Sequence, residues 1–288
     1  MRSDFAAFIL THGRPDRVLT YKTLRKCGYT GKIYLLVDDE DKCGDEYRKL
    51  YGDQVLTFNK RESLAIVDDG INDDDFRAVV YARNVCFEIA KGLGLKWFVQ
   101  LDDDYTGFQN RFGADLMPKA SPVRRMDAML SAIIEYLTET GIACVAISQG
   151  GDWMGGPASC PTPRVRRKVM NFFVFSVDSK FRFMGKVNED TTGYVLQGRC
   201  GLVSFTLMQA SVEQLQTQTN PGGLTEIYLE NGTYVKSFYS VMYAPSCVKI
   251  GAMGDPRSGN YRFHHEIDWP RAVPCILREE HRKGGGRW

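Results

Sequence analysis

The sequence predicts an α/β fold in which a largely parallel sheet forms the centre of a single compact domain. Short apolar runs alternate with segments of helical periodicity through the first half, as in βαβ units. The second half carries glycine-rich loops and hairpin signals, which indicate a mixed sheet there. The 288 residues are enough for one such domain, and neither a repeat nor a Pro- and Ser-rich linker divides the chain.

The elements of the first half follow from apolar runs and from the breakers between them. Phe5–Leu10 is a strand that ends before Gly13, and leucines then suggest a helix that stops near Gly28. Lys32–Val37 is the second strand. The elements expected next are a short helix at Glu46–Tyr51, a strand at Gln54–Phe58, a helix at Phe76–Lys91, a strand at Lys96–Leu101, a helix from Ser121 to about Gly141 and a strand at Ala143–Ile147. In the last of these helices, Met126, Met129, Leu130, Ile133, Ile134 and Leu137 recur at helical spacing.

An acidic stretch precedes the helix at Phe76–Lys91, and it contains Asp68, Asp69 and the run Asp73-Asp74-Asp75. Negative charge near a helix start is stabilised by the helix dipole. We favour this interpretation of the stretch over metal binding.

The second half is expected to add strands of both directions. Asn171–Val177 reads as an apolar strand, whose phenylalanines 172, 173 and 175 are expected in the core. The pair Asn231-Gly232 predicts a hairpin turn between strands at Glu226–Glu230 and Thr233–Phe238. The domain is expected to span residues 1–277, with halves at 1–110 and 111–277, followed by a flexible charged tail at 278–288.

Composition excludes several classes of protein. With 43% hydrophobic and 25% charged residues, the chain is neither disordered nor fibrous. Lys and Arg total 37 against 35 Asp and Glu, so a whole-protein basic field is excluded, although a local basic patch is not.

Neither a membrane partner nor secretion is expected. No run of about 18 apolar residues occurs, and the apolar run at 5–10 is too short for a signal peptide. Eight cysteines are widely spaced without a C-x-x-C pair, which is typical of reduced, mostly buried thiols and therefore of a cytoplasmic protein. The sequence leaves the oligomeric state open.

The run Asp102-Asp103-Asp104 directly follows the apolar strand at Lys96–Leu101. In parallel sheets the carboxyl ends of the strands are where ligands bind. Alternation along an extended strand would place Asp102 and Asp104 on one side, where their oxygens suit Mn²⁺ or Mg²⁺. The alternative is a solvated turn or a helix cap, but adjacent carboxylates repel one another unless a cation is present.

Two further motifs suit a phosphate-containing ligand. Thr11-His12-Gly13-Arg14 follows the first strand, where a turn and a helix start can hold a nucleotide, although an ordinary turn would look similar. Asp38 ends the second strand, and Arg83-Asn84 lie on the helix before the aspartates. Arg83 could pair with phosphate or with the carboxylate cluster, or be a plain exposed arginine.

The pair Glu189-Asp190 and the pair His264-His265 complete the candidate residues. A carboxylate pair outside a periodic helix can supply a general base for a hydroxyl nucleophile, or simply stand at a helix start. Of the two adjacent histidines, one could complete the coordination of a metal held by early aspartates.

In this order, the motifs resemble a GT-A-type glycosyltransferase. The resemblance implies a Rossmann-type nucleotide-sugar-binding half (1–110) and an acceptor half (111–277). It implies that Asp102, Asp103 and Asp104 form the metal-binding D-x-D, with His264 or His265 as a further ligand, and that Asn188-Glu189-Asp190 is the motif that carries the base. Asp190 is favoured over Glu189, and the transfer would be inverting.

More narrowly, three sequence segments resemble those of the TET/JBP-associated glycosyltransferases of phages. They are residues 8–17, Tyr81-Ala82-Arg83-Asn84 and Leu101–Tyr105. This resemblance implies a nucleotide-sugar donor, such as UDP-glucose or UDP-GlcNAc, and implies 5-hydroxymethylcytosine in DNA as the acceptor. The nucleotide-sugar site would then include Thr11, His12, Gly13, Arg14, Asp38, Arg83, Asn84, Asp102 and Asp103. A phage-encoded enzyme would act in the cytoplasm of an infected bacterium.

A local basic run agrees with DNA as the partner. Arg164, Arg166, Arg167 and Lys168 would contact phosphates, and Trp153 could stack on a base that is flipped out of the duplex. A solvated loop would have the same composition. Three other functions remain open: a transferase acting on a glycan, protein or small molecule, a nucleotidyltransferase, and an inactive DNA-binding module.

Overall fold

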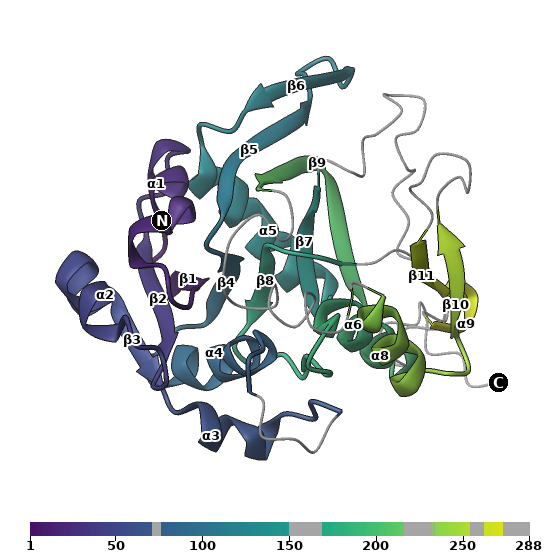
Figure 1. The fold of residues 1–288 in the computed structure, drawn as a ribbon. Helices are drawn as coiled ribbons and strands as arrows, with labels where there is room; N and C mark the ends of the chain where they lie inside the picture. The colour runs from purple at the N-terminus through teal and green to yellow at the C-terminus, as the bar shows by residue number, and fades with distance from the viewer. Residues whose placement is uncertain (71–75, 150–168, 216–231, 233, 254–261, 273–288) are drawn as a thin grey trace, which may run out of the picture.

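The computed structural model describes residues 1–70, 76–149, 169–215, 232, 234–253 and 262–272. Within these ranges the chain forms one nine-stranded sheet, with the strand order β3-β2-β1-β4-β8-β7-β9-β5-β6, and a separate β10-β11 pair (Figure 1). The strands of the large sheet are β1 (Phe5–Leu10), β2 (Lys32–Asp38), β3 (Val55–Phe58), β4 (Trp97–Asp102), β5 (Tyr105–Phe112), β6 (Pro118–Pro122), β7 (Cys144–Gln149), β8 (Phe173–Ser176) and β9 (Ser204–Gln214).

The first half of the sheet is parallel and the second half is mixed. Strands β3, β2, β1 and β4 run parallel, whereas β8 is antiparallel to both β4 and β7. Strand β9 runs parallel to β7, β5 is antiparallel to β9, and β6 is antiparallel to β5. The predicted α/β fold, with a parallel first half and a mixed second half, is confirmed.

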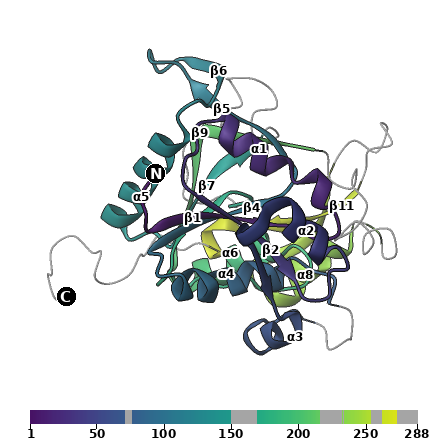
Figure 2. The same ribbon diagram turned by 90° about the vertical axis from the view of Figure 1, so that its left-hand side faces the viewer.

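The sheet is covered on both faces. Along β1, Phe5, Ala7 and Ile9 pack into one buried cluster, and the alternate residues pack into another on the opposite face. The first cluster lies under α1 (Leu19–Lys26) and α5 (Met126–Thr140), and the second lies under α4 (Val80–Gly92) and α6 (Glu189–Arg199), as Figure 2 shows. Burial on both sides explains why β1 is entirely apolar.

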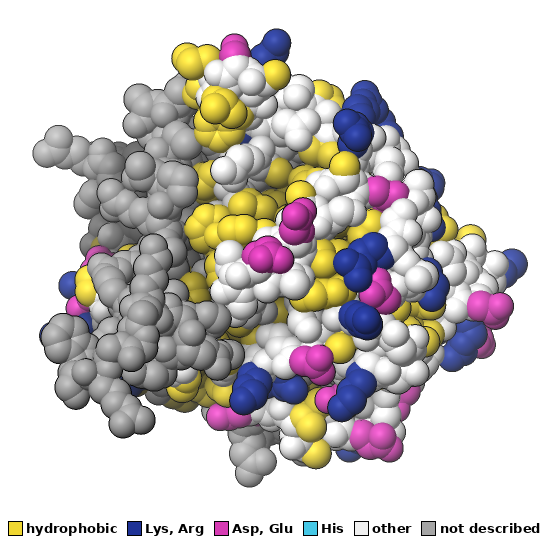
Figure 3. All heavy atoms as spheres, turned by 180° about the vertical axis from the view of Figure 1, so that it is seen from behind, with side chains coloured by type: hydrophobic (Ala, Val, Ile, Leu, Met, Phe, Trp, Pro, Cys, Tyr) yellow, Lys and Arg dark blue, Asp and Glu magenta, His cyan; other side chains and the backbone are white. Residues whose placement is uncertain are grey.

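Shorter elements border these layers. They are α2 (Gly44–Tyr51), α3 (Lys60–Ser63), α8 (Val235–Tyr243) and α9 (Trp269–Ala272), three 3-10 turns at Pro15–Arg17, Gly52–Gln54 and Leu64–Ile66, and the antiparallel pair β10 (Val248–Met253) and β11 (Arg262–Ile267). None of the helices in the described ranges is long and apolar enough to cross a membrane. On the face shown in Figure 3, basic and acidic side chains of the described residues are interspersed.

Several expected elements differ from the structure. Residues 118–122 form strand β6 and the following helix begins only at Met126, so the helix start predicted at Ser121 is wrong. Val235–Tyr243 is helix α8 and not the second strand of a hairpin. The other predicted hairpin strand, Glu226–Glu230, and the tail at 278–288 lie outside the described residues.

Of the acidic stretch expected at the start of the next helix, Asp73, Asp74 and Asp75 lie outside the described residues. Helix α4 begins at Val80, and the side chains of Asp68 and Asp69 bind tyrosines of α8 and α4. The Tyr243 hydroxyl donates to the Asp68 carboxylate at 2.8 Å, and the Tyr81 hydroxyl donates to that of Asp69 at 2.7 Å. Phe172, Phe173 and Phe175 are buried in the core, as expected.

Candidate functional site

The polar motifs of the first half meet at the carboxyl edge of the parallel strands. The register pairs Leu10 at the end of β1 with Leu36 of β2 on one side and with Asp102 of β4 on the other. The loop after β1, the end of β2 and the aspartate run after β4 therefore lie next to one another, where parallel sheets bind ligands.

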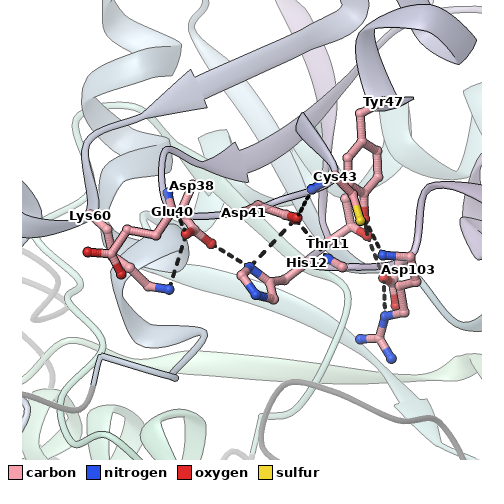
Figure 4. Close-up of polar contacts among 11 residues, drawn as sticks. Thr11, His12, Asp38, Glu40, Asp41, Cys43, Tyr47, Lys60 and Asp103 are labelled. Atoms are coloured by element: carbon pink, nitrogen blue, oxygen red, sulfur yellow. Dashed lines mark hydrogen bonds and ion pairs between the residues drawn. The ribbon is translucent and has the colours of Figure 1, made fainter. Parts of the chain in front are cut away.

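Asp103 holds the loop after β1 in place (Figure 4). Its Oδ2 accepts a hydrogen bond from Thr11 Oγ1 at 2.6 Å and another from Arg14 Nε at 2.8 Å. The Tyr47 hydroxyl of α2 bonds Thr11 Oγ1 at 2.8 Å and accepts from the Arg14 backbone N–H at 3.0 Å. Burial raises the pKa of Asp103, although Arg14 and Thr11 oppose that rise. The first loop is thus fixed to the aspartate run by charge-assisted hydrogen bonds.

A second group of charges fixes the same loop to β2. The His12 Nδ1 lies 2.7 Å from Asp38 Oδ2, and Lys60 Nζ lies 3.2 Å from Asp38 Oδ1 (Figure 4). The hydrogen bond to Asp38 raises the pKa of His12. Burial acts to raise the pKa of Asp38, but His12 and Lys60 outweigh it and the pKa is lowered. The backbone N–H of Gly13 donates to Asp41 Oδ2 at 2.7 Å, and Gly13 has a φ of +69° that favours glycine.

The three consecutive aspartates point to different partners. Strand β4 ends at Asp102, and Asp103 and Asp104 form a turn before β5. Strand alternation therefore does not determine where the side chain of Asp104 lies, because Asp104 is in the turn and not in the strand. Burial and the nearby charges of Asp102 and Asp103 raise the pKa of Asp104 to about 7. In the part of the chain that the structure describes, no cation forms an ion pair with Asp104.

Thr20 of α1 stabilises this turn, a role that no sequence motif indicates. Its hydroxyl donates to the backbone carbonyl of Asp102 at 2.6 Å and accepts from the Tyr105 N–H at 2.9 Å. Tyr47, Asp41 and Lys60 were missed in the same way. Their position after β2 or β3, next to Asp38, was the only signal that could have indicated them.

Arg83 is buried and binds carboxylates. Of the roles considered for it, pairing with the carboxylate cluster is therefore the one that the structure shows. Its Nη2 donates to Asp102 Oδ1 at 3.0 Å and its Nε donates to Glu189 Oε1 at 2.8 Å. Asn84 does not face the site. Its side chain is used entirely on backbone groups, since Nδ2 donates to Val80 and Phe183 carbonyls and Oδ1 accepts from the Phe183 N–H. The expected role of Asn84 in nucleotide-sugar binding is therefore corrected to a structural one.

Glu189 and Asp190 begin helix α6, so the expectation that they lie outside a helix is wrong. The residue before them, Asn188, has a φ of +61° and donates from Nδ2 to Ser240 Oγ of α8 at 2.5 Å. Glu189 is buried, which raises its pKa, and it is bound to Arg83. Asp190 is half-buried, and its Oδ1 accepts from the Thr191 N–H at 2.6 Å. Of the two carboxylates, Asp190 is the more accessible.

The two histidines of β11 approach this motif from the other side. His265 is buried with its Nδ1 3.4 Å from Asn188 Nδ2, and the rings of His264 and His265 lie 4.2 Å apart. Among the described residues, no three His, Cys, Asp or Glu side chains meet as a complete metal site. The predicted DNA-binding residues Trp153, Arg164, Arg166, Arg167 and Lys168 lie outside the described ranges.

The family model of the TET-associated glycosyltransferases matches residues 5–223 of this chain. The chain belongs to the TET-associated glycosyltransferase family. The match includes the loop Thr11–Arg14, the aspartates 102–104 and the pair Glu189-Asp190, whereas His264 and His265 lie beyond it. The predicted family is confirmed. This TET-associated glycosyltransferase is therefore an enzyme that transfers a sugar.

Three solved structures show distant likeness to this TET-associated glycosyltransferase. One is glucosyl-3-phosphoglycerate synthase from Mycobacterium tuberculosis in complex with Mn²⁺, UDP and phosphoglyceric acid, with 10% identity and a TM-score of 0.49 over 91% of this chain and 86% of that one. S. aureus TarS (residues 1–349) has 11% identity and a TM-score of 0.39, over 82% of this chain and 65% of that one. A cytidylyltransferase from Leptospira borgpetersenii has 13% identity and a TM-score of 0.37, over 82% and 86%. No curated protein sequence matches the chain.

Proposed function

We propose that this enzyme transfers a sugar from a nucleotide sugar, such as UDP-glucose or UDP-GlcNAc, to the hydroxyl of 5-hydroxymethylcytosine in DNA. Membership of the family supports sugar transfer. The observation that carries the mechanism is the arrangement at the carboxyl edge of β1, β2 and β4. There, the loop Thr11–Arg14 is fixed to Asp103, beside Asp104, a carboxylate that forms no ion pair with the described side chains.

The donor set fits a hard divalent cation. Asp102 and Asp104 offer carboxylate oxygens, and the raised pKa of Asp104 reflects negative charge that a cation would relieve. The Asp102 side chain is 31% exposed, and Arg83 takes only its Oδ1. We propose that these two aspartates hold Mn²⁺ or Mg²⁺, with His264 or His265 as a further ligand. The bound cation would supply charge neutralisation for the departing diphosphate.

The loop after β1 and the end of β2 would hold the nucleotide. The Arg14 side chain is 23% exposed and uses Nε on Asp103, which leaves its terminal nitrogens to donate to a diphosphate. His12 is 44% exposed beyond its bond to Asp38, so the ring can contact the nucleoside. Asp103 positions the loop, and its buried carboxylate contributes no ligand oxygen of its own.

Asp190 is the proposed general base. It would take the proton from the acceptor hydroxyl as that oxygen bonds to the anomeric carbon and the nucleoside diphosphate departs. Attack from the face opposite the diphosphate inverts the anomeric centre. Glu189 is unsuited to this step because it is buried and bound to Arg83.

DNA as the acceptor rests on the family and on the sequence. The basic run of Arg164, Arg166, Arg167 and Lys168 would contact the phosphates, and Trp153 would stack on the flipped base.

The test is mass spectrometry of hydroxymethylated DNA after incubation with mixed sugar nucleotides and Mn²⁺. The mass gain names the sugar and establishes the acceptor together. Asp104→Ala is expected to abolish transfer, and Asp190→Asn to lower kcat about 10³-fold with binding of UDP and Mn²⁺ intact. Asp45→Asn, an exposed carboxylate on α2, is the matched control and should be fully active. Full activity of Asp104→Ala, or of the wild type in EDTA, would overturn the metal assignment.

Other outcomes of the same assay point to other functions. Transfer to a glycan, a protein or a small molecule, with none to DNA, would assign a different acceptor. Release of pyrophosphate from a nucleoside triphosphate and a sugar phosphate would indicate a nucleotidyltransferase. Binding of DNA without binding of UDP and Mn²⁺ would indicate an inactive DNA-binding module.

A further inference from the structure

A single guanidinium joins the two halves of the site. Arg83 of α4 donates from Nη2 to Asp102, the last residue of β4, and from Nε to Glu189, the first residue of α6. The two distances are 3.0 and 2.8 Å, and only 4% of the Arg83 side chain is exposed. Asp102 belongs to the proposed metal site, and Glu189 directly precedes the proposed base, Asp190. The two hydrogen bonds of Arg83, here called the Arg83 bridge, therefore connect the proposed metal site to the start of the helix that carries the proposed base.

The bridge is held rigidly. The Arg83 guanidinium lies over the rings of Phe173 and Phe183, with its carbon 5.1 and 5.5 Å from their centroids. Behind it, Gln100 Nε2 donates to the Arg83 carbonyl at 2.7 Å. Because the donors of a guanidinium point in fixed directions in one plane, two carboxylates bound to it have a fixed separation and orientation.

The arrangement is a poor solution for stability alone. Arg83 Nη1 is buried, and no partner for it occurs among the described residues. Buried charges with unsatisfied donors are costly, and apolar side chains of similar volume usually serve a core as well. The bridge must therefore be explained by the geometry that it imposes.

We propose that Arg83 is a positioning residue, which acts through Glu189 to set the place of Asp190 relative to Asp102. This inference rests on the proposed function. Arg83 occupies Oδ1 of Asp102, so Oδ2 is the oxygen that would bind the proposed cation. Glu189 is the anchor of helix α6 and never takes the proton. Neither Arg83 nor Glu189 contacts the diphosphate or the acceptor.

Substitutions at Glu189 distinguish two roles for this residue, an anchor of helix α6 and a general base. Glu189→Gln keeps an oxygen that can accept from Arg83 Nε, so kcat should stay within about tenfold of the wild type. Glu189→Leu removes the acceptor, and kcat should fall about 100-fold because a misplacement of about 1 Å has that effect on a reaction rate. The donor KM and the Kd of UDP with Mn²⁺ should change less than threefold in both. Loss of activity in Glu189→Gln equal to that of Asp190→Asn would overturn the proposal.

Substitutions at Arg83 test the other end. Arg83→Lys keeps the charge but its single ammonium cannot hold both carboxylates in the same geometry, so kcat should again fall with the donor KM unchanged. Arg182→Lys is the matched control, because Arg182 lies over Phe87 in the same aromatic cluster and donates only to backbone carbonyls. Its kcat should be unchanged. A parallel rise in donor KM and in the Kd of UDP for Arg83→Lys would make Arg83 a phosphate ligand and refute the bridge.

A measurement without an acceptor distinguishes failure of this inference from failure of the proposed function. If the wild type does not modify DNA, the proposed acceptor is wrong, and hydrolysis of the nucleotide sugar by water is compared across the same variants. Thermal midpoints of Arg83→Met, Glu189→Leu and the double variant test the contact itself. We expect the two decreases to be clearly less than additive, and strict additivity would show that the bridge does not exist.

Discussion

Asp104 is expected to destabilise the metal-free protein at neutral pH, and its removal should therefore increase stability. Burial, with the charges of Asp102 and Asp103, raises its pKa from 3.8 to about 7. Below pH 3.8, Asp104 is protonated in the folded and in the unfolded chain. Between pH 3.8 and about 7, the unfolded chain ionises first, so the free energy of unfolding falls as the pH rises.

The magnitude follows from the two pKa values. The interval from 3.8 to about 7 corresponds to about 4 kcal/mol, at about 1.4 kcal/mol per pH unit. Asp104 is only half-buried, and solvent screening reduces this to about 2 kcal/mol. Asp104→Asn, which has the same shape without the charge, should therefore raise the free energy of unfolding by about 2 kcal/mol at pH 8 and leave it unchanged at pH 4.

The assay is urea unfolding of the wild type and the variant in EDTA at pH 4, 6 and 8, with Asp45→Asn as the control for an exposed carboxylate. The same substitution should abolish sugar transfer, because Asp104 is a proposed ligand of the metal ion. A variant that is less stable than the wild type at pH 8, or equally affected at all three pH values, would refute the reasoning.

Three further outcomes are expected. Asp103→Asn and Arg14→Gln should show a coupling of about 1–2 kcal/mol in a double-mutant cycle measured by urea unfolding, and additive effects would contradict the 2.8 Å contact. The bond to Asp38 raises the pKa of His12 above 6.5, so the stability it contributes is present below pH 6.5 and is lost as the pH rises through the raised pKa. His12→Ala should therefore lower the thermal midpoint more at pH 6 than at pH 9. Mn²⁺ at 100 times its Kd should stabilise the wild type by about 2.7 kcal/mol but not Asp104→Asn, and EDTA should reverse the shift in calorimetry.

The parallel half of the fold could be predicted because its strands are buried on both faces. A run such as Phe5–Leu10 has no polar residue to compete with the strand assignment, and all six of its side chains are buried. In the mixed half only some strands, such as β7 and β8, offer such runs. Strand β5 (Tyr105–Phe112) carries polar residues throughout and is defined by its pairing with β9, about 100 residues later in the chain. The Asn231-Gly232 signal is local, and it does not report that Val235–Tyr243 packs as a helix against β10 and β11.

At the site, the sequence predicts the place of the aspartates but not how they divide their roles. The run Asp102-Asp103-Asp104 follows a buried strand, and this is sufficient to place it at the ligand-binding edge. One aspartate then binds Arg83, the next binds Thr11 and Arg14, and the last is left without a cation among the described side chains. Which of the three does which depends on the turn that begins after Asp102, and a strand of unknown length cannot indicate that turn.

The bridge through Arg83 shows what kind of information was missing. Arg83 stands in an apolar helix between Val80 and Phe87, and a charged residue in such a segment must have a buried partner. The sequence therefore implies that a carboxylate approaches it. It does not say which of 35 acidic residues that is, and the answer, Glu189, lies 106 residues away along the chain. Because Glu189 is used in this way, its neighbour Asp190 is the carboxylate that we propose as the base, and this proposal rests on a packing contact rather than on the motif itself.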